Sequence, residues 1–443
     1  MEKTWIDKDR EYIWHPFTQM KEHLPILIER AKGVYLYDDK GNKYIDAVSS
    51  WWVNTLGHAN ERLNKVLYEQ AQTMEHVIFS GFTHKSAIEL AEKLVEFTCP
   101  KLTKVFYSDN GSTAVEVALK MAYQYQVHKG RPEKSKFIAF ENSYHGDTIG
   151  AVSVGGVDLY HKVYKPLLFD IYQGMSPTCY RCPVGCSKET CKAQCLDTVE
   201  ATLKEHSKNI AGVIIEPLIQ CAGGMIVYPP KHLKRLRELC DKYDVLLILD
   251  EVATGFYRTG KLFAYEHADI EPDIMCIAKG ITAGYMPLSA TMSSQEIFDA
   301  FYDDWDKMKT FFHGHSYTAN PLATRIAVEN LKILKEENIQ EQVEKKSTLL
   351  AFELEKFREL KYVGDVRYIG MVGAIELVAD KETKEPFEPY ERIGTRIYNR
   401  ALELGAVLRP LGDVIYFMPP YVISEDELKK LMDIAKTAIL ELS

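Results

Sequence analysis

The sequence lacks any long apolar run and any excess of positive charge. No uninterrupted apolar stretch approaches the ~18–20 residues that a helix needs to cross a bilayer. The opening stretch, MEKTWIDKDREYIWHPFTQM, is too charged to hold the apolar centre of a signal peptide. A net charge of −9 is also unsuited to a nucleic-acid-binding surface. We therefore expect a cytoplasmic protein that binds small molecules and neither nucleic acid nor membrane.

The sequence also lacks the cysteine pattern of a small disulfide-stapled fold, because its nine cysteines are spread unevenly over 443 residues. Residues 171–195 are dense in Cys, Pro and Gly, and we expect them to form a loop. The cysteines of this loop are Cys179, Cys182, Cys186, Cys191 and Cys195. Such a group can hold zinc or an iron–sulfur cluster, but its spacing matches no standard run closely. A metal, a disulfide and free thiols all remain open, and we assign no metal here.

The composition that is present, 46% hydrophobic and 26% charged, is that of an ordinary globular protein. From residue 61 to 334, short apolar runs alternate with helical patterns, which predicts an α/β domain with a large, mostly parallel sheet. Beyond it, NIQEQVEKKSTLLAFELEKFREL predicts a long amphipathic helix, and short strand-like pieces follow. We expect residues 335–443 to form a small α+β domain, against which residues 1–60 pack.

One lysine stands where burial makes its charge costly. In PDIMCIAKGITAGYMPLSAT, residues 272–291, the stretch from Asp273 to Ala278 is typical of a buried strand, and Lys279 follows at once. The alternative is a surface lysine whose stem lies along apolar neighbours. If the amine is buried, its pKa falls and the neutral, nucleophilic form is favoured.

Two further features are expected near Lys279, because ligands of open parallel sheets bind beyond the carboxyl ends of the strands. After KVFYSD, residues 110–113 open a helix whose N–H groups suit a phosphate, although Ser112 or Thr113 could simply cap that helix. Asp250 ends the apolar run VLLILD and could bind a metal or a protonated ring nitrogen. Together, a phosphate cradle, a buried carboxylate and a strand-end lysine indicate a pyridoxal phosphate site.

Several stretches, in order, resemble the class III pyridoxal-phosphate aminotransferases. They are SDNGSTAVEVALKMA, SYHGDTIGAVSV, IIEPLIQCAGGM, LDEVATGFYRTG, AKGITAGYMPLSAT and HGHSYTANPLA, and the resemblance runs over about residues 12–425. It implies a fold-type I PLP-dependent transferase, aspartate aminotransferase-like, with pyridoxal 5′-phosphate as cofactor. It also implies a homodimer with active sites at the interface.

The resemblance implies a role for each residue of the cofactor site. Lys279 would form the Schiff base, and Asp250 would pair with the pyridinium nitrogen. Gly111 and Ser112 would hold the phosphate. Tyr144, in SYHGD, would stack on the ring and also meet substrate.

More distant positions complete the predicted site. Gln220 would contact the ring hydroxyl, His315 would lie beside the cofactor, and Ser316 would reach the phosphate from the neighbouring subunit. The residues expected to bind substrate are Trp51, Trp52, Tyr144, Lys279, Gly314, Arg409 and Tyr416. Phe17 and Asp147 are further candidates for substrate recognition, although Phe17 stands where many members have tyrosine and Asp147 could be a helix cap.

Within the class, IWHPFTQM, SSWWVNTLGH and LRPLGDVIYFMPPY resemble the subfamily that converts 8-amino-7-oxononanoate to 7,8-diaminononanoate in biotin biosynthesis. Arg409 would then bind the carboxylate of the substrate, with a tryptophan as apolar wall. The amino donor, S-adenosylmethionine or lysine, stays open. The alternatives are a class III omega-aminotransferase acting on ornithine, 4-aminobutyrate or a diamine, an aminomutase, and a DNA-binding regulator, for which the net acidity is wrong.

Overall fold

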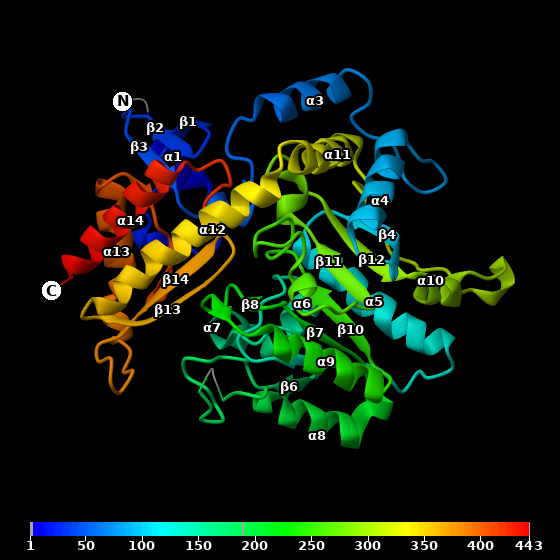
Figure 1. Cartoon of the computed structure of the whole chain (residues 1–443). Coiled ribbons are helices and arrows are strands. Elements are labelled where there is room, and N and C mark those ends of the chain that lie inside the picture. The colour runs from blue at the N-terminus through cyan, green and yellow to red at the C-terminus, as the bar shows by residue number, and fades with distance from the viewer. Residues whose placement is uncertain (1–2, 188–189, 443) are drawn as a thin grey trace.

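The centre of the molecule is a seven-stranded sheet (Figure 1). The computed structural model describes residues 3–187 and 190–442. The strand order is β4 (Leu102–Ser108), β12 (Ser289–Ser294), β11 (Ile274–Ile277), β10 (Leu246–Asp250), β7 (Ile210–Ile215), β5 (Lys136–Phe140) and β6 (Tyr172–Gly174). Within it, the pairings are parallel except those of β12, which is antiparallel to both neighbours. The predicted α/β class with a mostly parallel sheet is therefore confirmed.

The central strands are apolar because helices cover both faces of the sheet. In β10, Leu247 and Leu249 pack in one buried cluster and Ile248 packs in another, since successive side chains of a strand point to opposite faces. Helix α5 (Gly111–His128) lies in the cluster of Ile248. The opposite cluster includes residues of α4 (Lys85–Phe97), α8 (Asp197–His206), α9 (Pro230–Lys242) and α11 (Pro321–Glu336). In such a covered sheet, ligands bind beyond the carboxyl ends of the strands.

The two ends of the chain fold together. The C-terminal sheet has the order β13 (Val363–Ile369), β14 (Val372–Leu377), β17 (Val414–Phe417) and β16 (Pro410–Leu411). It packs with α12 (Ile339–Glu355) and α13 (Ile393–Glu403), and α14 (Glu425–Leu440) packs against these two helices. A second small sheet joins β1 (Ile28–Lys32), β2 (Tyr35–Asp38) and β3 (Lys43–Asp46) to β15 (Ala406–Val407). Figure 1 shows these blue N-terminal strands beside the orange and red C-terminal elements. Domain boundaries at residues 60 and 335 stay a prediction.

The remaining elements are short or peripheral. They are α1 (Trp5–Tyr12), α2 (Ser49–Trp52), α3 (Glu61–Ala71), α6 (Ile149–Ser153), α7 (Asp158–His161), α10 (Gln295–Phe301), β8 (Ile219–Gln220) and β9 (Ile226–Val227). In the part of the chain that the structure describes, no helix is long and apolar enough to cross a membrane.

Residues 171–195 differ in part from the predicted loop. The segment begins with β6, the edge strand of the central sheet, and ends with a short 3-10 helix from Gln194 to Leu196. None of its cysteines forms a disulfide in the part of the chain that the structure describes. The edge strand escaped prediction because Tyr172–Gly174 is too short to carry an alternating pattern.

Candidate active site

A cavity of about 650 Å³ opens at the carboxyl edge of the central sheet. Its polar residues come directly from the ends of parallel strands: Asp109 follows β4, Glu216 follows β7, and Asp250 ends β10. Tyr144 comes from the loop after β5, and Lys279 from the turn after β11. Chain segments far apart in sequence thus meet at one edge, where the topology predicts a ligand.

Lys279 opens a short 3-10 helix, Lys279–Thr282, at the end of β11. Asn330 of α11 fixes this turn by donating from its amide nitrogen to the carbonyl oxygens of Gly280 and Ile281, at 2.8 and 3.0 Å. The amine lies 5.1 Å from the centre of the Trp52 ring. Burial lowers the pKa of Lys279, and the nearby Asp250 opposes that shift. The amine is therefore biased toward its neutral, nucleophilic form.

Asp250 is held by a histidine that sequence reasoning did not single out. His145 Nδ1 lies 2.7 Å from Asp250 Oδ2, and the Val252 N–H donates to Oδ1 at 3.1 Å. Both side chains are buried. Hydrogen-bond partners on both oxygens fix the orientation of the Asp250 carboxylate, a group that could pair with a protonated ring nitrogen.

Glu216 is a second buried carboxyl group that sequence reasoning missed. It accepts hydrogen bonds from the Tyr144 N–H at 3.0 Å and the Cys221 N–H at 2.9 Å. Burial raises the pKa of Glu216 to about 7. A signal was present, because Glu216 follows the apolar strand β7 just as Asp250 ends β10.

The start of α5 lines the larger cavity where the sequence predicts a phosphate. The alternative role of Ser112 or Thr113 as the helix cap is not seen, because Asn110 caps the helix by accepting from the Thr113 N–H at 3.1 Å. The Ser112 hydroxyl instead lies 2.7 Å from the Thr148 hydroxyl. A Cβ added at Gly111 would lie 2.6 Å from Val252 Cγ1, so only glycine leaves room there. Free N–H groups at the start of a long helix suit a phosphate.

A smaller cavity of about 290 Å³ adjoins the first and shares Trp52, Val53, Tyr144 and Lys279 with it. The other lining residues are Phe17, Trp51, Tyr160, Ala222, Arg409, Leu411 and Tyr416. This cavity unites the predicted Phe17, Trp51, Trp52, Tyr144, Lys279, Arg409 and Tyr416. Arg409 lies over the Trp51 ring, with Cζ 4.4 Å from its centre, and Trp52 Nε1 donates to the Tyr416 hydroxyl at 3.1 Å. This smaller cavity, called the slot below, is lined mostly by apolar and aromatic side chains and has one guanidinium.

Tyr160 lines the same slot but gave no sequence signal. Its ring lies 5.4 Å from that of Phe17 and 6.1 Å from that of Tyr144, both measured between ring centres. It comes from the short helix α7, and only the tertiary fold brings it to the site. Asp147, in the same region, accepts from the Tyr144 hydroxyl at 2.7 Å and does not cap α6, whose N-cap is Thr148.

Four predicted residues do not line either cavity. Gln220 is fully buried, and its amide is engaged by the Ser176 hydroxyl and the Glu141 carbonyl. Gly314, His315 and Ser316 lie on an outer loop, where Gly314 and Ser316 are exposed. His315 reaches the cavity indirectly, because its Nδ1 lies 2.9 Å from Asp109 Oδ2.

Comparison with known proteins assigns the family. The family model described as "Aminotransferase class-III" matches residues 17–439. The chain is 49% identical over 435 residues to an adenosylmethionine-8-amino-7-oxononanoate aminotransferase of Geobacter sulfurreducens, covering 97% of this chain and 96% of the relative. It is 48% identical over 444 residues to one of Aquifex aeolicus, covering 99% and 98%.

Solved structures agree with the sequence relatives. The adenosylmethionine-8-amino-7-oxononanoate aminotransferase of Methanocaldococcus jannaschii superposes with a TM-score of 0.93 at 43% identity, covering 98% of each chain. The omega transaminase of Pseudomonas jessenii in complex with PMP superposes with a TM-score of 0.95 at 34% identity, covering 99% of this chain and 98% of that one. The chain, which has the transaminase fold expected from its sequence, belongs to the class III aminotransferases.

Proposed function

We propose that the protein transfers an amino group to 8-amino-7-oxononanoate, forming 7,8-diaminononanoate for biotin biosynthesis, with S-adenosylmethionine as donor. The observation that carries the proposal is the slot beside Lys279, in which Arg409 lies over the Trp51 ring. An aliphatic chain that ends in a carboxylate matches an apolar slot with one guanidinium. The names of the relatives in Geobacter, Aquifex and Methanocaldococcus carry the same substrate and donor.

The cofactor is pyridoxal 5′-phosphate, as the class III family implies. When bound, it supplies an aldehyde that takes up amino groups and a ring that accepts an electron pair. Of this chain's residues, Gly111 and Ser112 would hold the phosphate, Asp250 the ring nitrogen and Lys279 the aldehyde carbon. Tyr144 would lie against the ring.

Lys279 has two tasks in this proposal. It would hold the aldehyde carbon of the bound cofactor, and its free amine would carry the proton at the reacting carbon of the substrate. Burial favours the neutral amine for both tasks, because it lowers the pKa of Lys279. The Trp52 ring beside the amine excludes water from that proton transfer.

S-adenosylmethionine, the proposed donor, is larger than the keto substrate and needs additional space. A third cavity of about 860 Å³ shares Tyr160, Ala222 and Leu411 with the substrate slot. It lies between the loop that carries Cys179 and strands β13 and β14. We infer that the adenosyl part of the donor extends from the slot toward this space.

We also propose a homodimer. The loops that carry Phe82 and Tyr317 contact each other through His76, whose ring centre lies 5.3 Å from that of Tyr317. Both Phe82 and Tyr317 are about two-thirds exposed, at 65% each, and Ser316 directly precedes Tyr317 in sequence. Exposed aromatic residues on adjoining loops are typical of an interface. A cytoplasmic location stays a prediction.

The test offers keto and amino substrates one at a time, so that only a half-reaction can occur, and monitors the absorption spectrum of the cofactor. The proposal expects S-adenosylmethionine to convert the cofactor to its aminated form and 8-amino-7-oxononanoate to convert it back. Ornithine and 4-aminobutyrate should be poor donors. A fast response to either of those amines, with none to 8-amino-7-oxononanoate, would support the general omega-aminotransferase instead. Conversion of one substrate with no partner would indicate the aminomutase.

A further inference from the structure

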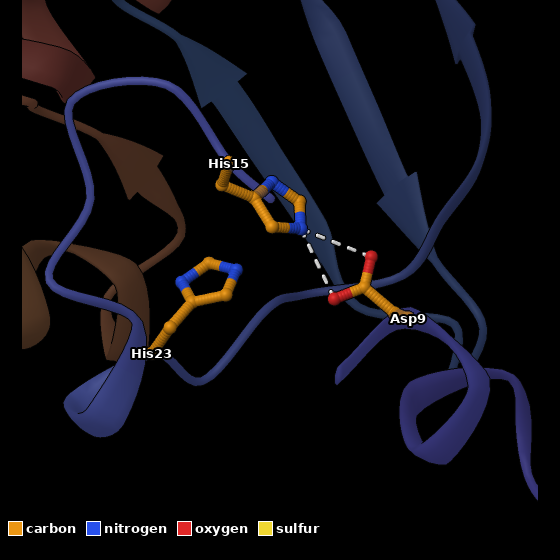
Figure 2. A group of neighbouring side chains, drawn as sticks. All are labelled: Asp9, His15 and His23. Atoms are coloured by element: carbon orange, nitrogen blue, oxygen red, sulfur yellow. Dashed lines mark hydrogen bonds and ion pairs between the residues drawn. The ribbon is translucent and has the colours of Figure 1, made fainter. Parts of the chain in front are cut away.

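Three side chains near the N-terminus converge on one point away from the catalytic site. Asp9 lies in the last turns of α1, His15 follows that helix, and His23 follows a 3-10 helix, Met20–Glu22. One donor atom from each of Asp9, His15 and His23 lies within 4.8 Å of the other two. His15 Nε2 lies 3.0 Å from each oxygen of the Asp9 carboxylate. Figure 2 shows the His23 ring turned toward this pair.

The third group of this cluster is unsatisfied. His23 Nε2 is buried and makes no hydrogen bond in the described structure. In Figure 2, one ring nitrogen of His23 points toward the outer nitrogen of His15 and the Asp9 carboxylate, with no dashed line between them. The ring centres of His15 and His23 are 4.3 Å apart. A buried ring nitrogen aimed at a histidine and a carboxylate lacks a ligand that all three can share.

The chemistry of the three groups selects one class of ligand. Two imidazoles and one carboxylate are a common set for zinc and other divalent transition metals, whereas calcium and magnesium prefer oxygen ligands throughout. Ligand atoms ~2.1 Å from a tetrahedral ion lie ~3.4 Å apart, so small side-chain rotations would close the present arrangement. A water molecule can take the fourth position.

Two residues of the cluster, His15 and His23, lie near the two ends of a segment that reaches the substrate slot. Residues 13–23, here called the N-terminal strap, run from the end of α1 to His23 and carry Phe17 near their middle. The Phe17 ring lies 5.7 Å from that of Trp51, between ring centres, and lines the slot. Phe17 has a φ of 51°, a left-handed conformation that a phenylalanine adopts only when its surroundings impose it. A ligand bound by both His15 and His23 would fix both ends of that turn.

We propose that Asp9, His15 and His23 bind a divalent transition-metal ion of the zinc type, and that this ion holds the N-terminal strap over the substrate slot. The site lies in a different part of the chain from the cysteine loop of residues 171–195. It also stands apart from the proposed aminotransferase reaction, so it can hold or fail independently of that function.

Cobalt binding tests the site directly. Cofactor-loaded protein is mixed with Co²⁺, freed of unbound ion and analysed for metal and visible absorption. The proposal expects about one Co²⁺ per chain, with weak absorption and no intense thiolate band, because its ligands are nitrogen and oxygen. His23→Gln and Asp9→Asn should each weaken binding by at least ~10-fold. Glu11→Gln, a matched change on the exposed side of α1, should leave binding unchanged.

The thiols of residues 171–195 are the competing ligands, and a Cys182→Ser/Cys186→Ser double variant separates the two sites. The proposal expects this variant to bind Co²⁺ like the unmodified protein. It is overturned if the unmodified protein retains no Co²⁺, if His23→Gln binds equally well, or if only the cysteine variant loses the ion.

The strap offers a second readout. Lys21 is exposed within it and is a cleavage site for trypsin. Saturating Zn²⁺ should slow cleavage after Lys21 by about tenfold or more, because a ligand that binds only the closed form lowers the population of the open one. The same Zn²⁺ should have no effect on His23→Gln. Equal cleavage rates with and without Zn²⁺ in the unmodified protein would overturn the proposed tie.

Discussion

His145 Nδ1 lies 2.7 Å from Asp250 Oδ2 at the floor of the cavity that Lys279 enters. The pair is buried, and hydrogen-bond partners on both carboxylate oxygens fix the orientation of Asp250. In the proposed function, a charged Asp250 would keep the ring nitrogen of the cofactor protonated, and His145 acts through Asp250 as a positioning residue.

Replacing Asp250 tests this charge. Asp250→Asn should lower kcat by about 10²–10³-fold, because a neutral amide cannot stabilise a protonated ring nitrogen. His145→Asn should lower kcat less and shift the pH profile, since it removes only the group that holds the carboxylate. The measurement is kcat against pH for both variants. A His145→Asn variant as impaired as Asp250→Asn, with an unshifted profile, would assign His145 a different role.

Lys279→Ala should reduce turnover by at least about a thousandfold, because no other lysine among the described residues lines the two cavities that Lys279 lines. The variant should still bind the cofactor non-covalently through the start of α5 and Asp250. The spectrum should therefore lose the band of the covalently attached cofactor while equilibrium dialysis still detects binding. Retained turnover in this variant would contradict the assigned role of Lys279.

Arg409→Leu should raise the KM for the keto acid by about 10–100-fold, which corresponds to the ~1.5–3 kcal/mol of a hydrogen bond to a charged group. The kcat at saturation should change much less, because the carboxylate lies far from the reacting carbon. Arg409→Lys should recover part of the affinity and not all, since it lacks the forked donor and the stacking on Trp51. An unchanged KM in Arg409→Leu would remove the structural basis for the substrate assignment.

Glu216 should make the stability of the cofactor-free protein depend on pH. Burial raises the pKa of Glu216 to about 7 from an ordinary value of 4.5, so the folded state keeps a proton that the unfolded state has lost between those values. The contribution of Glu216 to the free energy of unfolding therefore falls as pH rises through this window, by roughly 3 kcal/mol. Glu216→Gln does not titrate, so its stability relative to the unmodified protein should improve from pH 4.5 to 7. If the denaturation midpoints of Glu216→Gln and the unmodified protein changed in parallel from pH 4.5 to 7, the raised pKa would be contradicted.

Tyr416→Phe should destabilise the protein by about 1–3 kcal/mol, because it leaves the buried Trp52 N–H without its acceptor. Urea denaturation measures the change. Tyr390→Phe is the matched control, since Tyr390 is 79% exposed, and it should be neutral. Equal stability of the two variants would show that water replaces the tyrosine hydroxyl at no cost.

The sequence predicts those site residues that stand at the carboxyl ends of parallel strands. Asp250 and Lys279 each stand at the carboxyl end of an apolar strand, and such ends meet wherever the strands are parallel. Glu216 stands at the end of β7 in the same way. The residue that caps α5 cannot be chosen from local sequence, because asparagine, serine and threonine all cap well.

Other features depend on tertiary folding and left no local pattern. Tyr160 reaches the substrate slot from the short helix α7, whose sequence has no periodic signal. Asp9, His15 and His23 are unevenly spaced in sequence, and the fold of the N-terminal segment brings them together. Conversely, the engagement of Gln220 with Ser176 arises from β8 packing beside the segment after β6, a contact between distant parts of the chain.

The most direct test of the central proposal is a full-turnover assay on 8-amino-7-oxononanoate, with S-adenosylmethionine and lysine offered separately as amino donors. The account predicts that 7,8-diaminononanoate forms at catalytic rates with S-adenosylmethionine. Product with lysine alone would keep the reaction and contradict the proposed donor. No 7,8-diaminononanoate with either donor, from protein whose cofactor spectrum still responds to ornithine or 4-aminobutyrate, would contradict the account.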